Sequence, residues 1–362
     1  MGKFPELRVD LKKLENNIVQ IKNRCNEYGV NLAGVIKGCT GFAEVAKKFD
    51  EVGVSFIASS RMEQLEPLKE KGIKSPLMLI RIPMLSEVDE VVSKIDVSLN
   101  SEVSVLKALN ESARKQGKTH DVILMKDLGD LREGFYDVNE IIDAAILVEN
   151  ELTNLHLLGI GTNLGCYGAV AATSEKLNEL VECAEMIEEK IGRKLEYISG
   201  GATTSLPRIL EGNMPERINL LRVGEGIILG KDLIDLWGYK MDYMNKDVFT
   251  LRCEVIEVKD KPTHPVGEIM FDAFGNQPTY EDRGIRKRAL LAIGKVDYAF
   301  LDDLILREEG AFLVGASSDH TIVDVEDCKR DIKVGDIMEF DLCYSTLVYV
   351  TNSSNINKVF VD

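Results

Sequence analysis

The chain has 362 residues, of which 45% are hydrophobic and 29% are charged, and its 60 acidic and 44 basic side chains give a formal net charge of −16. This composition indicates a folded, soluble protein rather than a disordered one. The acidic balance argues against nucleic acid or an anionic membrane as the main partner, because phosphate binding needs clustered Lys and Arg. The length suits a large barrel followed by a second domain.

Neither targeting nor disulfide signals are present in the pattern of residues. Residues 1–7 lack the apolar core of a secretory signal, and no run approaches the roughly 18 apolar residues of a membrane span. The cysteines are odd in number and never spaced as Cys-x-x-Cys, so we expect free thiols in the cytoplasm rather than disulfides or a zinc site. They are Cys25, Cys39, Cys166, Cys183, Cys253, Cys328 and Cys343.

The first 236 residues alternate short apolar runs with stretches of helical periodicity. The runs are mostly too short for helices, and their near-continuous apolarity is typical of parallel strands buried on both faces. Eight such runs predict a (β/α)₈ barrel over residues 1–236. We prefer the barrel to a doubly wound sheet because no Gly-x-Gly-x-x-Gly follows the first run. The runs are residues 32–36, 54–58, 76–80, 95–99, 122–125, 155–160, 195–198 and 218–221.

Helices are expected between these runs. Leu11, Leu14, Ile18 and Ile21 form one apolar stripe, and Asp10 can cap its N-terminus. From about residue 249 the period changes to two, and further short apolar runs follow. Residues 237–362 are therefore predicted to form a mostly antiparallel β domain. Its expected strands lie at residues 249–255, 288–294, 311–315, 321–325 and 337–342.

In such a barrel, functional side chains gather at the C-terminal ends of the strands. Lys37 follows the first run, where burial would lower its pKa and make it a usable amine nucleophile. The alternative is a lysine that only extends its ammonium group to solvent. Residues 199–205 and 222–226 follow the seventh and eighth runs, and their glycines, hydroxyls and backbone N–H groups are typical of a phosphate-binding cradle. Loops of this composition are also common turns.

In combination, the strand-ending lysine, the Ser-Gly-Gly-x-Thr loop, the Arg-x-Gly stretch and the C-terminal β domain resemble the alanine racemase superfamily of fold-type III pyridoxal-phosphate (PLP) enzymes. The chain is most similar to its ornithine racemase branch, through residues 129–134 (GDLREG), 314–320 (VGASSDH) and 344–361. The resemblance covers essentially the whole chain. It implies PLP as cofactor, racemisation of an amino acid by two-base proton transfer at Cα with ornithine, a basic amino acid, as the favoured substrate, and a homodimer with shared active sites.

The resemblance also implies roles for individual residues. Lys37 matches the lysine that binds PLP and acts as one racemising base, and Arg222 matches the arginine that faces the pyridine nitrogen. Arg132 matches an arginine near the substrate carboxylate. Asn163 stands where alanine racemases place a histidine against the PLP ring, so the chain departs from the family pattern at this position. The expected cofactor-binding residues are Lys37, Asn163, Thr203, Thr204, Arg222, Gly224, Glu225, Gly226 and Tyr344.

The resemblance leaves the second base open. Alanine racemases carry a tyrosine in a Gly-Tyr-Ala-Asp-Gly phrase contributed by the other subunit. Here the matching phrase is residues 294–298, with Lys295 in the tyrosine's column and Tyr298 three residues on. Either could exchange the proton. Further candidates are Asp319, His320 and Tyr344.

A substrate with a second ammonium group needs a carboxylate or several acceptors. Acidic residues in the loops of the expected site suit a basic amino acid better than alanine, although solvated acidic residues are common in so acidic a chain. The expected substrate-binding residues are Asp130, Asp297, Ser318, Asp319 and His320, with Glu225 as a further carboxylate.

Several alternatives remain at this point. One is a racemase for alanine or of broad specificity. A PLP lyase of the D-threonine aldolase type would need a metal bound by His and Cys, and His320 is not followed by the required pair, although Cys343 remains. A decarboxylase would need a Cys-Asp pair and a Glu-Pro-Gly-Arg loop, which are missing from the sequence. A bare PLP carrier lacks a β domain, and a PLP-free hydrolase is the last alternative. No metal site is expected.

Overall fold

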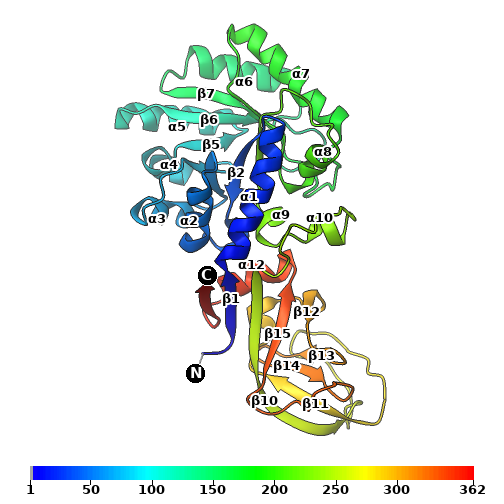
Figure 1. The fold of residues 1–362 in the computed structure, drawn as a ribbon. Helices are drawn as coiled ribbons and strands as arrows, with labels where there is room; N and C mark the ends of the chain where they lie inside the picture. Colours follow the sequence, from blue (N-terminus) through cyan, green and yellow to red (C-terminus); the bar gives the residue numbers. More distant parts are fainter. Residues whose placement is uncertain (1–2) are drawn as a thin grey trace. The chain divides into compact units, whose positions relative to one another are not determined.

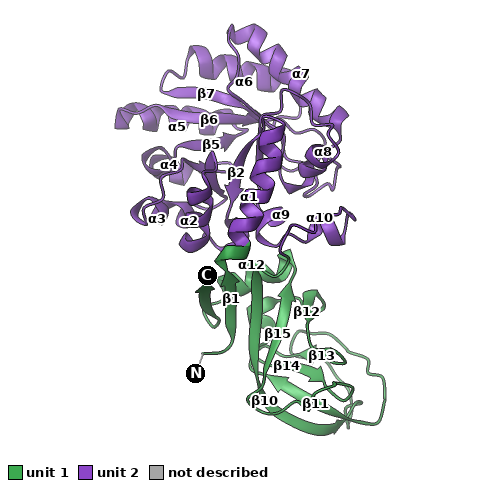
Figure 2. Ribbon diagram, in the orientation of Figure 1, with its two compact units in different colours: residues 1–13, 246–362 green, residues 14–245 purple. Residues whose placement is uncertain are grey.

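A computed structural model describes residues 3–362 of the chain and divides them into two compact units (Figures 1 and 2). The barrel unit comprises residues 14–245. The β unit combines the described residues up to Lys13 with residues 246–362. None of the helices among residues 3–362 combines the length and the apolar composition needed to cross a bilayer.

The barrel unit contains a closed barrel of eight parallel strands, as the sequence predicts. Each predicted apolar run overlaps one strand, and β9 pairs with β2 to close the ring. The near-continuous apolar runs thus mark strands that are buried on both faces. The strands are β2 (Asn31–Val35), β3 (Phe56–Ser59), β4 (Leu77–Leu79), β5 (Val97–Asn100), β6 (His120–Met125), β7 (Leu155–Gly161), β8 (Tyr197–Ser199) and β9 (Leu220–Val223).

Helices alternate with these strands and pack on the outside of the barrel (Figure 1). In the first helix, Leu14, Ile18 and Ile21 are buried, and Asp10 Oδ1 accepts a hydrogen bond from Lys13 N at 2.9 Å, so the predicted stripe and cap are both confirmed. The helices are α1 (Leu11–Glu27), α2 (Ala43–Val52), α3 (Met62–Glu70), α4 (Val88–Lys94), α5 (Val103–Gln116), α6 (Val138–Asn150), α7 (Ser174–Ile191), α8 (Leu206–Leu210), α9 (Glu225–Ile228) and α10 (Asp232–Asp235), with short 3₁₀ turns η1 (Lys37–Cys39), η2 (Leu85–Glu87) and η3 (Thr203–Ser205).

Side chains fill the barrel interior, so the ligand-binding end is the mouth rather than a pore. The interior cluster includes Ala33 and Val35 from β2 and Ile123 and Met125 from β6, which are spaced by two as in any strand. All four are at most 4% exposed. This packing fixes the strand ends from which the loops of the site depart.

The β unit is a mostly antiparallel sheet, as the sequence predicts. Its main path runs β12-β15-β10-β11-β14-β13, and β1 is joined to β10 and β16. The short helix α12 and the strands β12 and β16 are not among the predicted elements. The elements are β1 (Glu6–Asp10), β10 (Phe249–Pro262), β11 (Ile285–Leu291), α11 (Lys295–Tyr298), η4 (Leu301–Asp303), β12 (Leu304–Leu306), β13 (Phe312–Ala316), β14 (Thr321–Asp324), β15 (Ile337–Leu342), α12 (Tyr344–Asn352) and β16 (Asn357–Val361).

The unit boundaries differ from the predicted division at residue 236. Strand β1, which the prediction placed in the barrel domain, pairs antiparallel with β10 and parallel with β16. Its Leu7 and Val9 are fully buried. At the other boundary, Asn17 Oδ1 accepts a hydrogen bond from Asn245 N at 2.8 Å, which holds the segment up to residue 245 on helix α1. Five residues of alternating pattern show a strand but not which sheet it joins.

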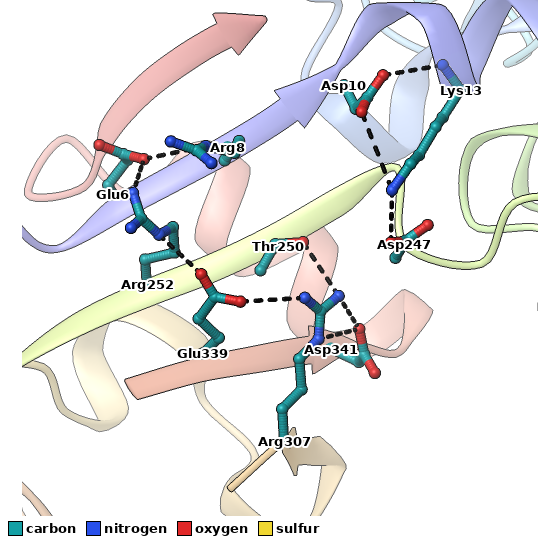
Figure 3. Close-up of polar contacts among 10 residues, drawn as sticks. All are labelled: Glu6, Arg8, Asp10, Lys13, Asp247, Thr250, Arg252, Arg307, Glu339 and Asp341. Atoms are coloured by element: carbon teal, nitrogen blue, oxygen red, sulfur yellow. Dashed lines mark hydrogen bonds and ion pairs between the residues drawn. The ribbon is translucent and has the colours of Figure 1, made fainter. Parts of the chain in front are cut away.

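A charged network ties β1 to its sheet (Figure 3). Arg252 on β10 donates from Nη1 to Glu6 at 2.8 Å and from Nε to Glu339 at 3.0 Å. Glu339 on β15 also pairs with Arg307 at 3.3 Å. Because Glu6 is only 5% exposed, its charge needs this partner, so the network fixes the N-terminal strand to β10 and β15.

Candidate active site

Lys37 lies directly beyond the end of β2, at the mouth of the barrel. The chain turns sharply there: Gly41 has φ +69° and donates its N–H to Ile36 O at 3.1 Å, and a Cβ on Gly41 would lie 2.6 Å from Gln64 Cβ. Burial, and secondarily the positive charge of Arg132, lower the pKa of Lys37. A lowered pKa increases the fraction of neutral amine at neutral pH, which is the form that attacks a carbonyl carbon.

Arg222 lies on β9 and is 4% exposed. It donates from Nη1 to Ser199 Oγ at 2.5 Å and from Nη2 to Thr162 O at 2.8 Å, both uncharged acceptors. Burial lowers its pKa to about 10, so the guanidinium is still charged at neutral pH. Among residues 3–362, no carboxylate forms an ion pair with it. A buried cation without an acidic partner is costly, and a bound acceptor would offset that cost.

The two loops predicted to form a phosphate cradle lie together. Gly226 N donates to Thr203 Oγ1 at 3.1 Å, and a Cβ on Gly226 would lie 2.8 Å from Thr203 Cγ2. A Cβ on Gly224 would lie 3.1 Å from Val35 Cβ. Side chains are thus excluded from this wall, where the Thr203 hydroxyl and the backbone from Gly224 to Gly226 lie together.

Two residues predicted for this cradle have other contacts. Thr204 Oγ1 donates to Leu164 O at 2.7 Å, so its hydroxyl hydrogen is directed to the loop after β7. The side chain of Glu225 accepts a hydrogen bond from Asp232 N at 3.3 Å. Burial and the Asp232 carboxylate raise the pKa of Glu225 to about 7. The Glu225 carboxylate is therefore directed to α10, and only its backbone remains a candidate for the cradle.

Asp130 joins the loop after β6 to the loop after β7. It is 1% exposed and accepts four backbone hydrogen bonds from the loop after β7. Burial alone would raise the pKa of Asp130, but these hydrogen bonds outweigh it and hold the pKa below its ordinary value. The donors are Gly165 N (3.1 Å), Cys166 N (3.3 Å), Tyr167 N (3.0 Å) and Val170 N (3.2 Å).

This geometry argues against the substrate-binding role predicted for Asp130, because its oxygens are already used by the backbone. Asn163 lies in the same loop, beside the fully buried Thr162. The Oγ1 of Thr162 has no hydrogen-bond partner among the described residues. The loop after β7 thus offers an unpaired buried hydroxyl next to the carbonyl group that binds Arg222.

Arg132 and Glu133 form an ion pair on the loop after β6. Arg132 donates from Nε to Glu133 Oε2 and from Nη2 to Oε1, and its Nη1 lies 2.7 Å from Cys166 Sγ. The Glu133 side chain is 20% exposed. The positive charge of Arg132 lowers the pKa of Lys37, and the negative charge of Glu133 acts in the opposite direction. The prediction omitted Glu133 and Cys166, although Glu133 stands next to Arg132 within the GDLREG phrase.

The predicted residues of the β unit fall into two groups. Tyr298 is fully buried, its hydroxyl lies 2.7 Å from Thr321 Oγ1, and burial raises its pKa to about 12. Asp297 is 4% exposed and accepts from Ser353 Oγ at 2.7 Å and from Asn355 Nδ2 at 3.0 Å. Both are therefore placed as core residues, which argues against a catalytic role for Tyr298 and a substrate contact for Asp297.

The second group is accessible. Lys295 is half-buried at the start of α11, with Nζ 4.3 Å from the centre of the Phe274 ring. Ser318 donates to Asp319 at 2.7 Å, and His320 is exposed. Tyr344 is half-buried and is the first residue of α12. Among the candidate bases of this group, Lys295 and Tyr344 are half-buried, whereas Asp319 and His320 are exposed.

Comparisons with known proteins agree with this site. Residues 9–231 match the family model for the alanine racemase N-terminal domain. The chain is 43% identical over 358 residues to the ornithine racemase of Acetoanaerobium sticklandii, covering 98% of this chain and 99% of that protein. It is 36% identical over 359 residues to the lysine racemase of Thermotoga maritima, covering 99% and 98%. The structure of the alanine racemase from Streptomyces coelicolor has a TM-score of 0.78 at 17% identity, covering 99% of this chain and 98% of that one, which is a likeness of fold.

The closed barrel of eight parallel strands and the mostly antiparallel β unit are the fold that this chain shares with alanine racemases of known structure. The chain belongs to the alanine racemase family, as the sequence motifs predict. Its activity is accordingly that of an amino-acid racemase, an isomerase.

Proposed function

We propose that the protein is a PLP-dependent racemase that interconverts the L and D forms of ornithine. The observation that carries this is the grouping, at one end of the barrel, of Lys37 with its lowered pKa, the buried Arg222 without an acidic partner, and the cradle at Thr203 and Gly226. The two full-length relatives named for ornithine and lysine support a basic amino acid as substrate.

The residues present fit PLP. Lys37 would hold its aldehyde carbon, Thr203 and the backbone from Gly224 to Gly226 its phosphate, and Arg222 its ring nitrogen. A buried guanidinium that needs an acceptor, and a wall from which side chains are excluded, are the two features that such a cofactor would use. Since Arg222 keeps its proton at neutral pH, it would donate a hydrogen bond to the ring without protonating it.

Bound PLP supplies an electron sink that acidifies the Cα–H bond of the amino acid. Lys37 takes or returns that proton at Nζ, because its lowered pKa leaves part of the amine neutral. Arg132 binds the α-carboxylate and orients Cα toward Lys37. A base on the opposite face completes the inversion, and we assign it to Lys295 of a second copy in a homodimer with shared sites.

A cytoplasmic location belongs to the same proposal. All seven cysteines are free thiols in the structure, which agrees with a reducing compartment.

The test compares the wild type with Lys37→Ala, using the exposed Lys71→Ala as a matched control. With PLP and L-ornithine in D₂O, the wild type and the control should incorporate deuterium at Cα and form D-ornithine. Lys37→Ala should lose the visible absorbance of bound PLP and about 10²–10⁴-fold in rate. Faster exchange with alanine than with ornithine would contradict the substrate, and no exchange with any amino acid would contradict PLP-dependent racemisation.

A further inference from the structure

The carboxylate of Glu133 lies among the positive charges at the barrel mouth. Its one charged partner in the described chain is the neighbouring Arg132, which it binds through both oxygens. Its charge also acts on Lys37 and on the buried Arg222. This acidic side chain therefore lies within electrostatic reach of the two cations that would hold the cofactor.

The backbone on either side holds this pair in place. Leu131 has φ +58°, a left-handed conformation that is unfavourable for a non-glycine residue, and its N–H is bound by Asp127 Oδ1 at 3.2 Å. Gly134 has φ +126°, and a Cβ there would lie 2.5 Å from Asp127 N. The loop is therefore fixed on both sides of Arg132 and Glu133 rather than being a free turn.

The other carboxylates of these strand ends are already committed. Asp127 accepts the N–H groups of Gly129 and Leu131, and Asp130 accepts four from the loop after β7. Glu225 accepts the N–H of Asp232 through Oε1 and is directed to α10, although its buried Oε2 has no hydrogen-bond partner among the described residues. In the described loops of the barrel mouth, Glu133 differs from these carboxylates because its hydrogen bonds are all to Arg132. Arg132 is also the residue proposed to bind the α-carboxylate of the substrate.

Glu133 and the α-carboxylate of a substrate would compete for Arg132. If an α-carboxylate binds Arg132, Glu133 loses its partner. Its negative charge is then unpaired, and this is costly because the Glu133 side chain is only 20% exposed. A diamino acid restores the balance, because its distal ammonium can take the vacated carboxylate, and one ion pair becomes two. An amino acid with an apolar side chain leaves the Glu133 charge unpaired.

We propose that Glu133 is the residue that selects a basic side chain, by accepting the distal ammonium of the substrate while Arg132 holds its α-carboxylate. This rests on the racemase function proposed above. Asp130 and Asp297, the carboxylates predicted for that task from the sequence, serve instead to anchor loops.

The experiment uses the PLP-loaded enzyme and two substrates of similar shape, L-ornithine and L-norvaline, which has a methyl group where ornithine has its aminomethyl group. The variants are Glu133→Gln, which keeps the shape but not the charge, and Glu133→Asp, which keeps the charge one methylene further back. Glu189→Gln on the exposed face of α7 is the matched control. Readouts are kcat/KM for ornithine, lysine and norvaline, and the inhibition constant of norvaline against ornithine, which is measurable whether or not norvaline reacts.

Glu133→Gln should lower kcat/KM for ornithine at least about tenfold while norvaline binds as well as before or better. Glu133→Asp should keep the preference for a charged side chain and shift it from ornithine toward the longer lysine. Equal losses for ornithine and norvaline would show that Glu133 only positions Arg132, and unchanged constants would show no role, so either result overturns the proposal. A wild type that does not prefer ornithine to norvaline would instead contradict the proposed function.

Discussion

Asp130 should be the residue whose loss most disorders the barrel mouth. Its four hydrogen bonds use both oxygens: Oδ1 accepts three N–H groups and Oδ2 accepts the N–H of Tyr167 at 3.0 Å. In Asp130→Asn one oxygen becomes an NH₂ group, which is a donor. At least one backbone donor then faces another donor, and the remaining bonds lose the charge of their acceptor.

The size of the effect follows from these contacts. Losing one hydrogen bond to a charged acceptor costs about 1.5–3 kcal/mol, and weakening the others adds to it. Residues 166–169 are exposed, so water can replace part of what is lost. We expect the loop after β7 to open about 2–4 kcal/mol more easily. Hydrogen exchange of the amides of residues 165–170 should therefore become roughly 30- to 900-fold faster.

Asp127→Asn is the matched control. Asp127 accepts Gly129 N at 2.8 Å and Leu131 N at 3.2 Å through the same oxygen, Oδ1, which the amide of asparagine can supply. It should cost about 1 kcal/mol or less. Racemisation should fall in Asp130→Asn, because Cys166 next to Arg132 loses its support. Equal effects of the two substitutions, or unchanged exchange at residues 165–170, would refute the reasoning.

The pH dependence gives a second check. The pKa of Asp130 is lowered in the folded state, so its stabilising contribution is full above the ordinary carboxyl pKa and is lost as pH falls through the lowered value. The difference between the wild type and Asp130→Asn should thus be constant near neutral pH and shrink below about pH 4. A difference that grows in acid would contradict the charged role of Asp130.

Three further predictions concern other predicted site residues. Tyr298→Phe should cost about 1 kcal/mol in urea unfolding, through the lost hydrogen bond to Thr321, with racemisation nearly unchanged, whereas a large fall in kcat would restore it as a catalytic base. Gly226→Ala should weaken PLP binding by about 1–3 kcal/mol in an absorbance titration, because the new methyl group crowds Thr203, and an unchanged Kd would argue against the cradle. Glu225→Gln should raise the free energy of unfolding by an amount that grows from about pH 4.5 to pH 7, because burial raises the pKa of this carboxyl to about 7 in the folded state and its ionisation opposes folding. A pH-independent difference would refute that assignment.

The sequence by itself determined the architecture and the positions of the cationic groups of the site. The eight barrel strands could be predicted because parallel strands buried on both faces must be apolar at nearly every position, a local signal. Lys37 directly follows the apolar run at residues 32–36 and Arg222 directly follows the run at residues 218–221, so both could be placed at the barrel mouth. The racemase resemblance then supplied their roles, and the comparisons confirm the family.

Only the tertiary structure decided what the carboxylates do. Asp130 finds its donors 35–40 residues away, and Asp297 finds Ser353 and Asn355 more than 50 residues away. The same holds for β1, whose partners lie at the far end of the chain. An acidic side chain is equally able to bind a substrate, an ammonium group or a row of backbone N–H groups, and which one it binds depends on groups that folding brings within about 3 Å.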